Sequence, residues 1–133
     1  MKYLLDTCVI SDFVKGVPNT LNQIKKTPPN ELAVSSITVM EIQYGLLLNS
    51  ERKRKIETII HDLIGSITTL DYTSGDAAET ACIRALLKQQ GQPIGSYDIL
   101  LAGVALNNQL IFVSSNIKEF NRIHDLKIEN WRS

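Results

Sequence analysis

The sequence has no excess of charge of either sign and no long hydrophobic run. Its 14 Lys and Arg residues balance 14 Asp and Glu residues, so a polyanion would have to be held locally rather than by overall charge. No apolar stretch approaches the roughly 18 residues that a membrane span requires. Met1-Lys2 leads directly into an apolar strand without a signal segment. We therefore expect a cytoplasmic protein that is not attached to a membrane.

Cysteine is scarce, and repeats, low-complexity tracts and interdomain linkers are missing. Cys8 and Cys82 are the 2 cysteines, and they form no Cys-x-x-Cys pair. Free thiols in a reducing compartment are the simplest interpretation, with both side chains serving as small core residues. A chain of 133 residues with 44% hydrophobic content fits one globular domain.

Short apolar strands alternate with helical segments along the chain. Tyr3-Leu4-Leu5 shows no polar alternation, which is typical of a strand buried on both faces. Gly65 is predicted to end one helix, and Ser96 to cap another. The pattern predicts an α/β fold with a parallel sheet and helices on both of its faces. Strands are predicted at 3–5, 32–34, 67–70, 110–113 and 127–129, and helices at 9–15, 18–26, 38–48, 51–64, 76–90, 97–107 and 117–122.

Acidic side chains follow several of these strands. Asp6 ends the first strand, Glu41 lies one turn into the helix after the second, and Asp98 opens the helix at 97–107. Because the carboxyl ends of parallel strands share one edge of a sheet, these acids are expected to meet there. The other polar residues expected at this edge are Thr7, Ser35, Ser36, Ser114, Ser115, Asn116 and Glu119.

Carboxylates that converge in this way favour a cation. Two of them about 5 Å apart repel each other by roughly 3 kcal/mol at an effective dielectric near 20. Three would have to take up protons or bind a metal ion. An all-oxygen set selects Mg²⁺ or Mn²⁺ over Zn²⁺. A cation of this kind favours hydrolysis of a phosphodiester.

Helix capping is the competing explanation for the same acids. Thr38-x-x-Glu41 and Asn116-x-x-Glu119 both match a capping box. A helix dipole favours an acid such as Asp98 in a first turn, and Asp6 can cap the helix that follows it. Capping does not require three acids on one edge, so it explains each residue singly better than it explains all of them together.

Three stretches carry a resemblance to a known family. They are YLLDTCVISDFVKG, VSSITVMEIQYG and QPIGSYDILLAGVALNNQLIFVSSNIKEFNRIHDLKIENW. Together they resemble the PIN-domain ribonucleases, and most closely the VapC toxins of bacterial VapBC toxin–antitoxin pairs. The resemblance runs nearly end to end, which makes residues 1–133 a single PIN domain.

The resemblance implies a three-layer PIN-like fold whose five-stranded parallel sheet has the first strand at its centre. It also implies a homodimer, a cognate VapB-like antitoxin that blocks the site, and a Mg²⁺- or Mn²⁺-dependent endoribonuclease that attacks RNA with a metal-activated water.

Carried over by position, the catalytic and metal-binding residues of the family fall on Asp6, Glu41, Asp98 and Asn116. Two departures concern their surroundings, since Cys8 replaces a common asparagine and Ser114-Ser115 replaces a Thr-Asn pair. Residues predicted to support the site or contact RNA are Thr7, Ser36, Ser115 and Arg84.

Other functions stay open at this point. A non-catalytic PIN-like module that acts through its antitoxin or another protein partner would keep the fold without the chemistry. A phospho-acceptor receiver domain shares the acidic edge but needs an Asp and Lys pair that the chain does not supply convincingly. The basic run 52–55 fits either a solvated helix face or an RNA-backbone contact. The sequence does not identify the RNA target.

Overall fold

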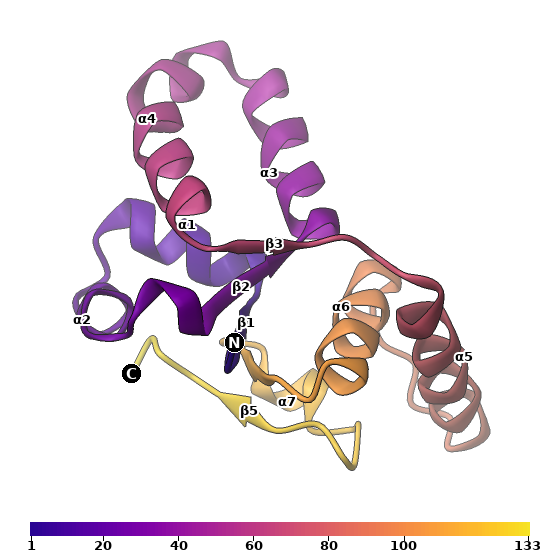
Figure 1. Cartoon of the computed structure of the whole chain (residues 1–133). Helices are drawn as coiled ribbons and strands as arrows, with labels where there is room; N and C mark the ends of the chain where they lie inside the picture. The colour runs from indigo at the N-terminus through magenta and orange to yellow at the C-terminus, as the bar shows by residue number, and fades with distance from the viewer.

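The computed structural model describes the backbone of residues 1–133 and every side chain except those of residues 52 and 53. Its centre is a parallel five-stranded sheet with the order β3-β2-β1-β4-β5 (Figure 1). The first strand is central, as the resemblance implied, and the fifth lies at an edge. The strands are β1 (Tyr3–Leu5), β2 (Leu32–Ser35), β3 (Thr68–Leu70), β4 (Ile111–Val113) and β5 (Ile128–Glu129).

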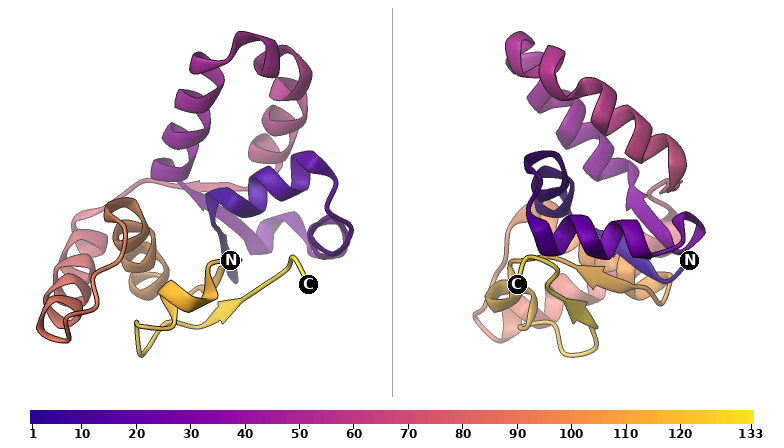
Figure 2. Two further views of the ribbon diagram at one scale, coloured as in Figure 1. Left: turned by 180° about the vertical axis from the view of Figure 1, so that it is seen from behind. Right: turned by 90° about the vertical axis from the view of Figure 1, so that its left-hand side faces the viewer.

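Helices lie on both faces of this sheet and confirm the predicted three-layer architecture. They are α1 (Thr7–Lys15), α2 (Pro18–Lys26), α3 (Ser36–Leu48), α4 (Ser50–Ser66), α5 (Ser74–Gln89), α6 (Ser96–Asn107) and α7 (Ile117–Phe120), with a 3-10 turn at Pro29–Glu31. The helical hairpin of α3 and α4 projects well beyond the sheet in every view (Figures 1 and 2). None of the helices, over the residues the structure describes, combines the length and apolarity needed to cross a bilayer.

Each strand contributes side chains to two separate cores, which is why the strands are apolar without alternation. Leu4 and Phe112 are fully buried on the face that α5 and α6 cover, together with Leu101 and Val104. Their direct neighbours along the strands point the opposite way. Leu5 and Val113 are also fully buried, against the core that includes Val9 and Ile10 of α1.

Several predicted boundaries are wrong for local reasons. Gly65 lies inside α4, which continues to Ser66. Ser96 is the first residue of α6 rather than its cap, because Gly95 occupies the N-cap position without a side-chain hydrogen bond. Cys82 is exposed on α5, so it is not a core residue. In contrast, Gly91 follows α5 with a φ of 66°, the left-handed conformation expected just after a helix.

Helices start directly at the carboxyl ends of two central strands. Asp6 separates β1 from α1, and Ser35 is both the last residue of β2 and the N-cap of α3. Ser114 follows β4. These short connections leave little freedom for the side chains at this edge, and they place the predicted site there.

Candidate active site

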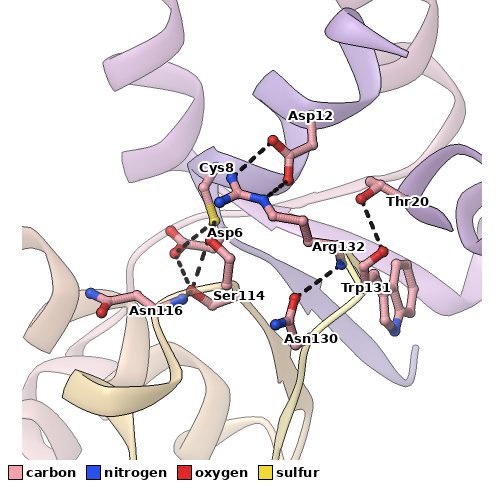
Figure 3. Close-up of polar contacts among 10 residues, drawn as sticks. Asp6, Cys8, Asp12, Thr20, Ser114, Asn116, Asn130, Trp131 and Arg132 are labelled. Atoms are coloured by element: carbon pink, nitrogen blue, oxygen red, sulfur yellow. Dashed lines mark hydrogen bonds and ion pairs between the residues drawn. The ribbon is translucent and has the colours of Figure 1, made fainter. Parts of the chain in front are cut away.

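Asp6 is the most buried acid of the site, with 7% of its surface exposed. Its Oδ1 accepts a hydrogen bond of 2.7 Å from the backbone N–H of Thr7, so it does cap α1. Its Oδ2 accepts from the Ser114 hydroxyl at 2.7 Å and from the Cys8 thiol at 3.6 Å (Figure 3). Burial raises the pKa of Asp6, and these three donors oppose that rise.

Glu41 reaches the site from the second turn of α3. The capping box predicted for Thr38 and Glu41 is wrong, because Ser35 caps this helix by accepting from the N–H of Ile37 at 3.1 Å. Glu41 Oε1 instead accepts from the Thr7 hydroxyl at 3.2 Å. Its pKa is raised, first by burial and then, against the Thr7 hydrogen bond, by the negative charge of Asp6.

Asp98 lies in the first turn of α6, the position that a helix dipole favours for an acid. Its pKa is raised from an ordinary 3.8 to about 6, first by burial and then by the negative charges of Asp6, Glu119 and Glu41. Four carboxyl groups, one between β1 and α1 and the others on α3, α6 and α7, therefore interact electrostatically. The dipole explains the position of Asp98 but not its raised pKa.

Asn116 and Glu119 form a separate link to the start of α6. The Asn116 amide donates to Glu119 Oε2 at 2.6 Å, and the N–H of Gly95 donates to Glu119 Oε1 at 2.9 Å. These bonds lower the pKa of Glu119. The predicted capping box is again wrong, since the backbone N–H of Asn116 donates to the Ser114 hydroxyl at 3.1 Å. Glu119 thus ties the loop before Asp98 to the loop that carries Asn116.

The residues predicted to support the site differ in how directly they contact its acids. Thr7 contacts Glu41 directly. The Ser36 hydroxyl accepts from the N–H of Tyr72 at 3.2 Å, which joins α3 to the end of β3. The Ser115 hydroxyl donates to the Cys8 sulfur at 3.4 Å, one step removed from Asp6.

Arg84, predicted to contact RNA, is exposed on α5. It lines a cavity of about 470 Å³ between α5 and α6, together with Lys88 and Ser96. Its contact with RNA stays a prediction. In the basic run 52–55, the side chains of residues 52 and 53 lie outside the described residues. Arg54 and Lys55 are exposed, and Lys55 lies 3.9 Å from Glu51.

The sequence did not reveal the role of Ser114, which is fully buried. Its hydroxyl donates to Asp6 and accepts from the backbone of Asn116, so one side chain links two predicted site residues. The sequence feature that could have indicated this role is the position of Ser114, a polar residue directly after an apolar strand. Cys8, predicted to be a small core residue and a departure from the family, also donates to Asp6.

The donor set fits a hard divalent cation in charge and chemistry. Asp6, Glu41 and Asp98 supply carboxylate oxygens, and across the described side chains none of them forms an ion pair with Lys or Arg. As the side chains stand, no three His, Cys, Asp or Glu residues of the described part are grouped so that they could hold a metal ion. Direct coordination by all three acids would therefore require them to move closer together.

The family model of the PIN domain matches residues 3–126. A tRNA(fMet)-specific endonuclease VapC of Shigella flexneri is 33% identical over 131 residues, with 98% of each chain covered. Ribonuclease VapC2 of Haemophilus influenzae is 37% identical over 131 residues, again with 98% of both covered. The chain therefore belongs to the PIN domain family and, within it, to the VapC proteins.

Solved structures agree with this assignment. A chain of the DNA-bound VapBC crystal structure from Salmonella typhimurium superimposes with a TM-score of 0.90 at 32% identity, and 98% of both chains is covered. VapBC-1 from nontypeable Haemophilus influenzae gives a TM-score of 0.87 at 30% identity over 100% of both chains. The similarity extends over nearly the whole chain.

Proposed function

We propose that this chain is the toxin of a toxin–antitoxin pair and acts as a divalent-metal-dependent endoribonuclease. The observation that carries the proposal is the set of interacting carboxylates, in which burial first, and then the negative charges of Asp6, Glu119 and Glu41, raise the pKa of Asp98 to about 6. Such a set is stabilised by a cation, and the VapC relatives are named as ribonucleases. The match to the PIN domain family gives no support to the alternative of a phospho-acceptor receiver domain.

Asp6, Glu41, Asp98 and Asn116 are the residues that would hold Mg²⁺ or Mn²⁺. A bound divalent ion lowers the pKa of a water and stabilises negative charge on phosphate oxygens. Ser114 and the N–H of Thr7 fix the two oxygens of Asp6, and Thr7 also holds Glu41. The chain thus orients two acids before any ligand arrives, which favours attack of water on an RNA phosphate.

Cleavage of labelled RNA by the purified protein tests this proposal. Activity is expected with Mg²⁺ or Mn²⁺ and is expected to stop when EDTA is added. Asp6→Asn and Asp98→Asn should abolish it while circular dichroism shows an intact fold. Asp125→Asn, which changes an exposed acid between α7 and β5, is the matched control.

Calorimetric titration with Mn²⁺ separates the nuclease from the alternative module. Binding by the wild type that is lost in Asp98→Asn supports the metal site. Absence of binding together with absence of cleavage would reject the nuclease and leave the non-catalytic partner-binding module. Cleavage that survives EDTA would reject the metal dependence.

The proposed partner is a VapB-like antitoxin, because the similar solved structures include VapBC complexes. A cleft in the hairpin supports this. One cavity of about 190 Å³ includes Thr7 and Glu41, and a neighbouring one of about 380 Å³ shares Ile42, Leu46 and Ile60 with it. An apolar segment lying there would reach the edge of the carboxylate site. Co-purification with the protein encoded by the neighbouring gene tests the pairing.

A homodimer and a cytoplasmic location complete the proposal. Light scattering of the purified protein would distinguish a dimer from a monomer. Fractionation of cells that express the protein would test its location. The RNA target requires mapping of cleavage sites on total RNA.

A further inference from the structure

A paired arginine lies on the α1 side of the site. After β5, Arg132 returns to α1 and donates from Nε to Asp12 Oδ2 at 2.9 Å and from Nη2 to Asp12 Oδ1 at 3.0 Å (Figure 3). Asp12 is buried, with 7% of its side chain exposed, whereas 51% of the Arg132 side chain is exposed. The pair therefore has a buried anionic half and an accessible cationic half.

The segment that carries this arginine is held on its way to α1. The backbone carbonyl of Glu129 accepts from the N–H of Ser114 at 3.0 Å, next to Asp6. The carbonyl of Trp131 accepts from the Thr20 hydroxyl at 3.1 Å, and its indole N–H donates to Glu129 at 2.9 Å. These contacts hold the segment against the end of β4 and against α2, so the guanidinium has a defined position.

Arg132 is close to the residues that surround Asp6. Figure 3 shows its guanidinium between Asp12 and Cys8 in that view. Hydrogen bonds to Asp12 and the charge of Asp12 raise the pKa of Arg132. The Cys8 sulfur in turn lies 3.6 Å from Asp6 Oδ2. In Figure 3 the guanidinium thus lies beside Cys8, which itself contacts Asp6, the most buried acid of the site.

The Arg132 guanidinium has N–H donors that Asp12 does not use. Its Nε and Nη2 bind Asp12, and Nη1 has no hydrogen-bond partner among the side chains and backbone that the structure describes. Arginine presents five N–H donors in a rigid plane that suits both carboxylate and phosphate. An arginine already held by one anion loses less freedom when it binds a second.

We infer that Arg132 binds a phosphate of the RNA strand on the α1 side of the carboxylates, an inference that rests on the proposed nuclease function. RNA carries a negative charge at every nucleotide, and the acids of the site repel it. The net charge of the chain is zero and offers no compensation. Arg132 supplies the local cation, and Asp12 orients it.

Binding of labelled single-stranded RNA, measured by fluorescence anisotropy over a range of salt concentrations, tests the inference. The background is Asp98→Asn, which keeps the RNA from being cut. The test variant adds Asp12→Asn and Arg132→Gln together, so that no buried carboxylate is left without a partner. Arg132→Lys keeps the charge but not the planar fork, and Lys25→Gln removes an exposed cation from α2.

The double change should weaken binding several-fold and lower the slope of log K against log salt by about 0.7, the loss of one phosphate contact on a single strand. The weakening should be equal for RNAs of different sequence. Arg132→Lys should keep most of the slope, and Lys25→Gln should keep all of it. If the double variant is too unstable to purify, Arg132→Gln alone removes the same phosphate contact, and circular dichroism must show that it keeps its fold with Asp12 unpaired.

Unchanged affinity and slope in a folded double variant would overturn the inference and leave the ion pair with a structural role only. That result would not affect the nuclease proposal if the wild type cleaves RNA. If the wild type neither binds nor cleaves RNA, the nuclease proposal fails and the role of Arg132 fails with it.

Discussion

Asp6 keeps hydrogen-bond donors at both carboxylate oxygens although it is almost fully buried. A buried carboxylate without donors would take up a proton or move toward solvent. The donors come from Thr7, next in the chain, and from Ser114, which is 108 positions away. Short-range and long-range contacts therefore both decide the ionisation of this one residue.

Ser114→Ala tests the long-range contact. Loss of the hydroxyl should raise the pKa of Asp6 further and lower the free energy of unfolding by about 1–2 kcal/mol. RNA cleavage should fall roughly 10- to 100-fold, as is typical when a residue that orients a metal ligand is removed. Thermal unfolding and cleavage rates measure the two effects. Ser115→Ala loses only a contact with Cys8, and an equally large effect there would contradict this role.

The raised pKa of Asp98 predicts how stability depends on pH. Because its pKa is about 6 in the fold against an ordinary 3.8, the folded state binds more protons than the unfolded state in that window. Stability from this residue therefore falls as the pH rises through the window. Asp98→Asn removes the effect, although solvent screening limits its size for a half-exposed group.

In EDTA at pH 7.5, Asp98→Asn should thus melt a few degrees above the wild type, and the difference should vanish near pH 4. Addition of Mg²⁺ should raise the melting temperature of the wild type more than that of the variant. Thermal unfolding followed by circular dichroism across this pH range provides the measurement. If the variant melts below the wild type at pH 7.5, the ionised Asp98 side chain does not destabilise the fold and this prediction is wrong.

At the scale of elements, the strands could be predicted from the sequence more fully than the helix ends. The β1 and β4 segments are short, apolar and buried on both faces, so their composition alone identifies them. A helix cap depends on a single hydrogen bond, and neighbouring Ser, Thr, Asp or Asn residues in the sequence are often equally able to form it. Ser35 caps α3 where Thr38 was equally plausible, and Thr73 with Asp76 forms a capping box on α5 that was not foreseen.

The same limit applies to the site. Asp6, Glu41 and Asp98 could be predicted as site residues because Asp6 ends a strand, the other two lie near the starts of helices, and the family resemblance falls on all three; the structure brings their charges into interaction. Arg132 could not be assigned, since its partner Asp12 is 120 positions away and no local motif connects the two. Ser114 and Glu119 were expected at this edge, but their hydrogen-bond partners were not predicted. Their partners depend on how loops fold over the strand ends.

The contact of α5 with α6 depends on Gly103. A Cβ at this position would collide with the Thr80 hydroxyl and lie 3.0 Å from the carbonyl oxygen of Asp76. Gly103→Ala should therefore lower the free energy of unfolding by about 1–3 kcal/mol. Gly45→Ala on α3 is the matched control, because nothing lies within 4 Å of its Cβ. It should stabilise by roughly 0.5–1 kcal/mol, and equal melting temperatures for both variants would contradict the close packing.

On the scale of the whole molecule, the first turns of α3, which carry Glu41, lie at the base of the projecting hairpin of α3 and α4 (Figure 2). The outer half of α3 exposes Tyr44, Leu47 and Leu48, at 61%, 75% and 70%. Such exposed apolar side chains next to an apolar cleft are typical of a surface that a partner protein covers. Substrate and antitoxin would then approach the same end of the molecule.

Leu47→Glu tests the use of this surface by the antitoxin. A carboxylate placed in an apolar contact should raise the dissociation constant of the complex roughly tenfold, about 1.4 kcal/mol. The fold should tolerate the change because the leucine is 75% exposed. Leu86→Glu is the matched control, an equally apolar residue that is 56% exposed on α5. Titration calorimetry with the purified antitoxin should show weakening in Leu47→Glu alone. Equal affinities for both variants would place the antitoxin elsewhere and free the hairpin for another role.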